Sequence, residues 1–255
     1  MKSIKLTKEI ATDILVVGLA KSATGLVIES GDAQIDSKKL LASLTDLGPT
    51  GNFDEITKIS FGSPRTIYLT GLGEAQKKYP HEVLRRAAGA AARALAGQVK
   101  ATFALPNSSS VDIAAIAQGA AFGAYAFNEF RESSKKDNKD PLAEVMVLTK
   151  FAMETDAKAV VTRAEVLAKN IYLVRDLINT PPSHLTPDSF SLRMKKIAMS
   201  LGLKVEILNE SGLKTKGYCG ITAVGQGSAN PPRLLHVSYA PAKAKKRFAF
   251  VGKSM

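Results

Sequence analysis

The sequence predicts an α/β fold built from two successive units. Strand-like and helix-like segments alternate through residues 1–150, a pattern typical of a mainly parallel or mixed sheet. After residue 150 the pattern changes to a long helix whose apolar residues recur every three or four positions. The chain has 255 residues, 45% of them hydrophobic, which suffices for one large domain or two ordinary ones.

Short apolar runs predict the strands of the first unit, and alanine-rich segments predict its helices. Strands are expected at 14–17, 25–28, 66–70, 102–105 and 145–148, and helices at 37–44, 81–95 and 111–130. Pro80 suits the first turn of the helix at 81–95. Gly119 and Gly123 predict that the helix at 111–130 packs closely on the sheet. The polar stretch 131–141 predicts a solvated loop.

The second unit is predicted to start with a helix from Thr155 to Asn179, ended by two prolines. Its apolar stripe consists of Val160, Ala164, Leu167, Ile171, Val174 and Ile178. Thr186 and Pro187 then start another helix, which Gly202 ends. Strands are expected at 204–208, 234–239 and 248–251. These patterns divide the chain into domains at 1–152 and 153–255.

The charge is uneven along the chain. Residues 1–155 have a net charge of +2 and residues 156–255 a net charge of +10. Either a nucleic-acid surface or the loss of an acidic partner segment explains a basic second unit. The sequence shows neither an apolar run long enough for a membrane span nor a secretory signal. Cys219 is the single cysteine, so no internal disulfide forms and a reducing, cytoplasmic location is expected.

Three glycine motifs resemble phosphate-binding loops only in part. Residues 71–73 follow a strand but lack the third glycine, so they indicate a tight turn. Residues 225–230 run into Pro231 and Pro232, so they indicate an extended loop. Residues 252–254 match the tail of a P-loop, but Arg247 stands where its first glycine is needed.

The ionisable residues do not form a complete catalytic set. The three histidines, His81, His184 and His236, have no second ligand at metal spacing, and His236 is expected to pack within a strand. Ser183 and His184 lack an evident acid partner for a serine triad. Nothing beside Cys219 indicates a lowered thiol pKa.

Three stretches of the second unit closely resemble the leucine aminopeptidase (cytosol aminopeptidase) family of metallopeptidases. They are VRDLINTPP at 174–182 followed by LTP at 185–187, VGQGSANPPRL at 224–234, and FVGK at 250–253. The first unit resembles the family's N-terminal domain. The resemblance implies a macro-domain-like α/β domain followed by the first part of a zinc-peptidase-like α/β/α catalytic domain.

The resemblance also implies the chemistry. In this family two divalent metals, zinc or manganese, activate a water that attacks the N-terminal peptide bond of a peptide. In the family, a strand is followed by a Gly-Lys pair whose lysine is one of the metal ligands. Lys253 matches this lysine. Cytoplasmic homohexamers acting in proteolysis are expected of such metalloexopeptidases.

The chain departs from the family after Lys253. The family continues with a glycine, further carboxylate ligands, a catalytic lysine and an arginine, whereas Ser254 and Met255 follow here. We therefore expect a truncated member that is inactive by itself, holds no metal alone and has a poorly stable second unit. The alternative is a non-catalytic binding module, for DNA as in some family members, or for an ADP-ribose-type ligand in the first unit.

Overall fold

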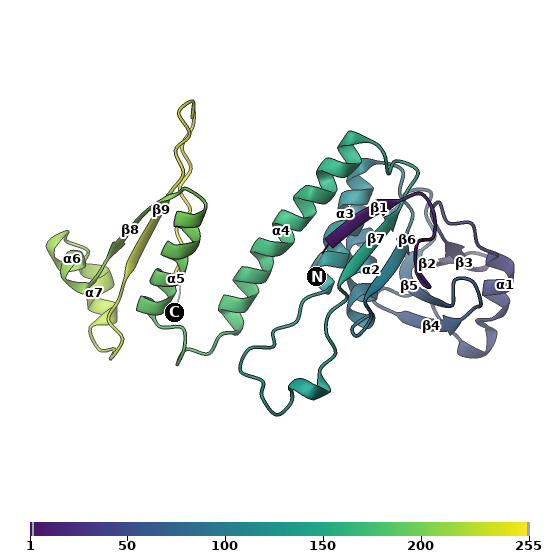
Figure 1. Cartoon of the computed structure of the whole chain (residues 1–255), viewed down its shortest axis with the longest axis horizontal. Helices are drawn as coiled ribbons and strands as arrows, with labels where there is room; N and C mark the ends of the chain where they lie inside the picture. Colours follow the sequence, from purple (N-terminus) through teal and green to yellow (C-terminus); the bar gives the residue numbers. More distant parts are fainter. Residues whose placement is uncertain (2, 254–255) are drawn as a thin grey trace. The chain divides into compact units, whose positions relative to one another are not determined.

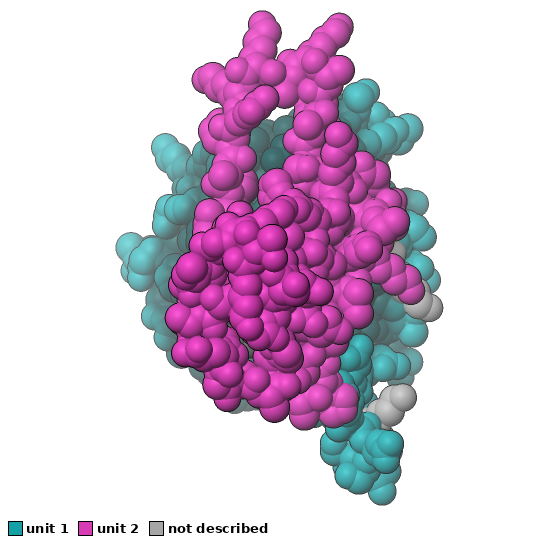
Figure 2. Space-filling model, turned by 90° about the vertical axis from the view of Figure 1, so that its left-hand side faces the viewer, with its two compact units in different colours: residues 1–175 teal, residues 176–255 magenta. Residues whose placement is uncertain are grey.

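The computed structural model describes residue 1 and residues 3–253, and its contacts divide the chain into two compact units. Unit 1 comprises residues 1–175 and unit 2 residues 176–255 (Figures 1 and 2). The division falls within a long helix because the first part of that helix packs on unit 1. The domain boundary expected between residues 152 and 153 stays a prediction. No helix in the described part of the chain is both long and apolar enough to cross a bilayer.

Unit 1 is built on a seven-stranded mixed sheet (Figure 1). Its strand order is β1-β7-β6-β2-β5-β4, and β3 pairs with β2. The pairs along the path from β1 to β5 are parallel, whereas β3 and β4 are antiparallel to their neighbours. The strands are β1 (Ser3–Thr7), β2 (Ile14–Ser22), β3 (Gly25–Glu29), β4 (Ile56–Ser60), β5 (Thr66–Glu74), β6 (Lys100–Ala104) and β7 (Glu144–Leu148). The predicted mixed, mainly parallel sheet is confirmed.

Helices cover both faces of this sheet and enclose two apolar clusters. Successive side chains of β2 point to opposite faces of the sheet. Val16 therefore belongs to the cluster on one face, and Leu15 and Val17 belong to the cluster on the other. The first cluster includes residues of α2 (His81–Ala94), α3 (Ser110–Gly123) and α4 (Thr155–Asn179). The second includes Leu40 of α1 (Ser37–Ala42). Unit 1 is therefore a three-layer α/β/α arrangement.

Helices α2 and α3 approach each other closely because glycines line their contact. A Cβ atom added at Gly119 would lie 2.0 Å from the carbonyl oxygen of Arg85. At Gly123 it would lie 2.2 Å from the carbonyl oxygen of Gly89. The expected close packing is present, but its partner is the backbone of α2 and not the sheet.

The buried face of α4 differs from the predicted stripe. Its fully buried residues are Ala157, Val161, Ala164 and Ala168, whereas Val174 and Ile178 are exposed. Small side chains let the helix lie close to unit 1, so they determine its contact face.

Polar contacts then fix the next turn of α4. Tyr172 donates hydrogen bonds to the carbonyl oxygens of Ala121 and Ala124. The Arg175 guanidinium donates to the carbonyl oxygen of Phe122 at 2.9 Å and lies 3.8 Å from the centre of the Tyr125 ring. The C-terminal end of α3 is thereby tied to α4.

Several sequence predictions for unit 1 were wrong in detail. The short polar-apolar strands β1 and β4 were not expected. Residues 71–73 do not turn but continue β5, with an irregular register beside β2. Helix α3 ends at Gly123 and not at residue 130.

Unit 2 contains a two-stranded antiparallel sheet and short helices. Its elements are α5 (Pro187–Ser200), β8 (Lys204–Leu208), α6 (Glu210–Thr215), α7 (Cys219–Gly225) and β9 (Leu234–Ser238). Helices α6 and α7 lie in a stretch expected to be a loop. The strand predicted at 248–251 is wrong for the described structure, where these residues are in no helix or strand and expose their large apolar side chains.

Candidate functional site

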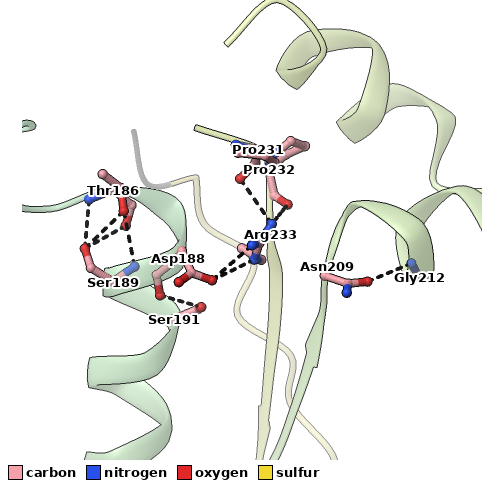
Figure 3. Close-up of polar contacts among 9 residues, drawn as sticks. All are labelled: Thr186, Asp188, Ser189, Ser191, Asn209, Gly212, Pro231, Pro232 and Arg233. Atoms are coloured by element: carbon pink, nitrogen blue, oxygen red, sulfur yellow. Dashed lines mark hydrogen bonds and ion pairs between the residues drawn. The ribbon is translucent and has the colours of Figure 1, made fainter. Parts of the chain in front are cut away.

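The N-terminus of α5 lines the candidate site, and Figure 3 shows the hydrogen bonds that cap this helix. The Thr186 hydroxyl accepts a hydrogen bond from the Ser189 amide at 3.3 Å, and the Thr186 amide donates to the Ser189 hydroxyl at 2.9 Å. This reciprocal capping box, with Pro187 in the first turn, fixes where the helix begins. The predicted helix start at Thr186 and Pro187 is confirmed.

An ion pair joins this helix to the segment before β9. Arg233 donates from Nε to Asp188 Oδ1 at 3.1 Å, and its Nη2 lies 3.0 Å from the same oxygen. Its Nη1 donates to the carbonyl oxygen of Pro232 at 3.1 Å (Figure 3). Arg233 thus holds together two stretches that lie 45 residues apart in the sequence. Sequence reasoning missed this pair because no local spacing connects the two residues.

The glycine of the 224–234 stretch has a packing role. A Cβ atom added at Gly225 would lie 2.5 Å from Cγ of Pro232, so the proline ring occupies the place of a side chain. The bend that this contact allows brings Arg233 and Leu234 back to α5. Residues 225–230 therefore act as a structural connection, and Gly225 itself ends α7.

The three family-like stretches meet at one cleft. It measures about 380 Å³ and includes Thr186 and Pro187 from the first stretch, Arg233 and Leu234 from the second, and Gly252 and Lys253 from the third. Lys253, the residue predicted to be a metal ligand, is exposed at this cleft. Residues separated by more than 60 positions in the sequence are thereby gathered in one place.

The described residues do not fit a metal centre by themselves. Within residues 1 and 3–253, no group of three or more His, Cys, Asp or Glu side chains is arranged to hold an ion. Lys253 supplies a single nitrogen, and hard dications need several oxygen ligands. The cleft therefore presents one expected ligand without the rest of a coordination shell.

The remaining candidate residues lie apart from this cleft or make local contacts. His236 is exposed on β9 and is not packed as expected. Ser183 Oγ lies 3.0 Å from Nδ1 of its neighbour His184. Cys219 is exposed at the start of α7.

The remaining histidine, His81, contacts a buried carboxylate in unit 1. His81 Nε2 lies 3.3 Å from Asp112 Oδ1. Asp112 Oδ2 accepts hydrogen bonds from the Ser108 amide and from the hydroxyls of Ser108 and Ser109, at 2.9 to 3.0 Å. Burial raises the pKa of Asp112, but these hydrogen bonds and the His81 charge outweigh it and hold the pKa below its ordinary value of 3.8. This carboxylate occupies the N-terminus of α3, where a phosphate would bind, so the adjoining 230 Å³ pocket gives no support to an ADP-ribose-type ligand.

We expect Asp112→Asn to destabilise unit 1 by about 1–3 kcal/mol at pH 7, because it weakens three hydrogen bonds to a buried charge. The folded pKa lies below the unfolded one, so the carboxylate stabilises the fold above pH ~4 and loses this effect as the pH falls through the folded pKa. The gap between variant and parent should therefore shrink at pH 3. Urea unfolding, together with hydrogen exchange at α3, measures the loss of stability at pH 7 and the smaller difference at pH 3. The exposed control Asp46→Asn should change little, and a gap independent of pH would contradict the assignment.

The chain is similar in sequence to members of one protein family over most of its length. Residues 16–134 match the N-terminal domain of the cytosol aminopeptidase family, and residues 172–255 match the catalytic domain of the same family. The chain is 43% identical over 262 residues to a "Probable cytosol aminopeptidase" of Streptomyces avermitilis, covering 95% of this chain and 51% of that protein. It is 36% identical over 247 residues to a protein of the same name from Leifsonia xyli, covering 96% and 48%.

The chain also resembles solved structures in its fold. The bottromycin maturation enzyme BotP in complex with Mn is 28% identical, with a TM-score of 0.71, covering 91% of this chain and 46% of that one. A mutant of tomato leucine aminopeptidase has a TM-score of 0.72 at 22% identity, covering 97% and 52%, and supports the fold alone.

The two matched domains show that this α/β chain is related to aminopeptidases. More specifically, the chain belongs to the cytosol aminopeptidase family. It contains the family's N-terminal domain and part of the catalytic domain, and it spans about half the length of the curated relatives it matches.

Proposed function

We propose that this chain forms the N-terminal half of a cytoplasmic, metal-dependent leucyl aminopeptidase. The observation that carries the proposal is the meeting of three family-like stretches at one cleft, with Lys253 among its lining residues. The match of residues 172–255 to the catalytic domain supports the same function. In this proposal the substrates are peptides, and Lys253 provides one ligand to a metal pair within a homohexamer.

The 255-residue chain alone is proposed to be inactive. A lysine ligates a metal only as a neutral amine, so a neighbouring cation must depress its pKa. The described residues offer no cluster of carboxylates to keep such a cation in place. The remaining ligands are expected from the part of the catalytic domain that the relatives possess outside the match. Manganese is the ion to test first, because a solved relative was obtained with Mn.

The first test measures release of leucine from a leucine anilide with Mn²⁺ present. We expect no release above buffer by the 255-residue chain, and release when its C-terminus is fused to the unmatched part of the Streptomyces avermitilis relative. In that fusion, Lys253→Ala should lower activity by at least about 100-fold, as expected for the loss of a metal ligand. Mn²⁺ titration by calorimetry should show weaker binding in the same variant.

Lys243→Ala is the matched control, because Lys243 is an exposed lysine that does not line the cleft. It should leave both activity and Mn²⁺ affinity unchanged. Leucine release by the 255-residue chain alone would contradict its proposed inactivity. Full activity of the fused Lys253→Ala variant would contradict the ligand assignment.

The binding-module alternative has the charge of unit 2 as its support. Residues 176–255 contain 12 Lys and Arg and 4 Asp and Glu, a net charge of +8. Binding to DNA through this charge would weaken steeply with salt, since phosphate contacts release counterions.

A further inference from the structure

A pocket of about 230 Å³ in unit 1 lies at the carboxyl ends of the parallel strands β5 and β6. Its lining includes residues 31–32 after β3, residues 77–79 after β5 and residues 106–108 after β6. The next parallel strand after β2 is β5, and the next after β6 is β7, so the connections of the neighbours β2 and β6 diverge to opposite sides. Open α/β sheets bind their ligands outside the strand ends at such a switch point.

The Asn107 side chain leaves an acceptor unused at this pocket. Its Nδ2 donates to the carbonyl oxygens of Leu105 at 2.9 Å and Leu148 at 3.1 Å. Because an amide nitrogen is only a donor, these two bonds fix which end of the side chain is the oxygen. The buried Oδ1 of Asn107 has no hydrogen-bond partner in the described part of the chain.

The Asp112 carboxylate leaves a second acceptor unused. The side chain is 2% exposed, and its Oδ2 accepts the hydrogen bonds from Ser108 and Ser109. Its Oδ1 makes no hydrogen bond with any described residue, although His81 Nε2 lies 3.3 Å away. A buried acceptor without a donor costs free energy. Since Asn107 and Asp112 both line the pocket, a ligand that brings a donor removes this cost.

The other charges of the pocket restrict the kind of donor. Among the described residues, no group of three or more His, Cys, Asp or Glu side chains could hold a metal ion, so the donor belongs to an organic group. Lys77 and Lys78 are exposed and line the same pocket. The pocket therefore combines buried acceptors with two cationic side chains, a pattern that matches a ligand with one cationic and one anionic end.

We propose that this pocket binds a free α-amino acid. Its ammonium group donates to Asp112 Oδ1 and Asn107 Oδ1, and its carboxylate pairs with the lysine ammonium groups of residues 77 and 78. Clefts for drug-sized ligands span roughly 300–1,000 Å³, so this smaller pocket suits a single amino acid. The site goes beyond the proposed function, because it lies in unit 1 and outside the match to the catalytic domain.

The test titrates the 255-residue chain with L-leucine and follows backbone amide resonances by NMR. L-Leucine is the probe because Leu84 and Pro106 give the pocket an apolar lining. We expect saturable shifts at residues 77–79 and 105–112. Isocaproate lacks the ammonium group and leucinamide lacks the carboxylate. Each should bind at least about tenfold more weakly than L-leucine, because each loses a charged hydrogen bond.

A paired variant tests the carboxylate contact. Lys77→Ala combined with Lys78→Ala should weaken L-leucine binding at least about tenfold but should not weaken leucinamide binding, because leucinamide has no carboxylate to lose. A merely structural effect of the variant would weaken both. Lys245→Ala combined with Lys246→Ala is the matched control, since these adjacent exposed lysines of unit 2 do not line the pocket. It should leave both affinities unchanged.

Several outcomes would overturn the proposal. A folded chain without shifts at residues 77–79 and 105–112 would do so. Shifts confined to residues 185–191 and 233–235 would assign L-leucine to the cleft of unit 2 instead. Equal affinities for L-leucine and isocaproate would contradict the ammonium contact, and tighter binding of dileucine than of L-leucine would assign the pocket to peptides. None of these readings depends on leucine release, so the aminopeptidase function can fail without affecting this result.

Discussion

Replacing Gly119 by alanine is expected to destabilise unit 1 by about 3 kcal/mol or more, beyond the usual range for one added methyl group in a packed core. Alanine favours a helix over glycine by about 1 kcal/mol, so propensity alone predicts stabilisation. The added Cβ, however, would lie 2.0 Å from the carbonyl oxygen of Arg85. That atom belongs to the backbone of α2, so relief requires the two helices to move apart and to loosen the apolar cluster beneath them.

Hydrogen exchange at α2 and α3 and urea unfolding measure this effect. Gly220→Ala is the matched control, because Gly220 lies in α7 and an added Cβ there meets no atom within 4 Å. The control should be neutral or slightly stabilising. If Gly119→Ala behaved like Gly220→Ala, the close approach of α2 and α3 would be wrong.

Phe103→Ala is expected to cost about 3–5 kcal/mol, because it removes a large side chain from a packed interior. Phe103 is fully buried on β6, a central strand of the sheet, within the cluster shared with α2, α3 and α4. The loss of apolar contact and the cavity left behind both contribute. Urea unfolding followed by circular dichroism gives the free energy of unfolding.

The comparison for this variant is Phe248→Ala, because Phe248 is 81% exposed in the 255-residue chain. It should change the free energy of unfolding by less than about 0.5 kcal/mol, as expected for an exposed position. Equal effects of the two variants would contradict the burial assigned to Phe103.

Local patterns predicted most of the α/β elements. Helix α4 covers Thr155–Asn179, the bounds expected from the two prolines that follow it, and strand β8 covers Lys204–Leu208 as expected. Strands β1 and β4 were missed because their apolar runs are short and mixed with polar residues. Their stability comes from pairing with β7 and β5, which no local pattern encodes.

The site was predictable only in part for the same reason. Resemblance selected Lys253 and the stretches around Arg233 and Thr186, but their meeting at one cleft depends on tertiary contacts. The Asp188–Arg233 ion pair and the packing of Pro232 on Gly225 are such contacts. The predicted strand at 248–251 failed because an apolar run forms a strand only where a partner completes its hydrogen bonds.

The pairing of β1 with β7 has a consequence for how the protein is made. Ser3 lies opposite Glu144 in the sheet, and the Ile4 amide donates to Glu165 Oε1 at 2.7 Å. Ser3 therefore waits for about 140 later residues before its native partner exists, at a synthesis rate of roughly 5–20 residues per second. During those seconds the β2–β3 hairpin can form locally, while the N-terminal strand stays available to chaperones or to misplaced pairing. This edge strand is thus synthesised before the other strands of its sheet and is among the last of them to find its place.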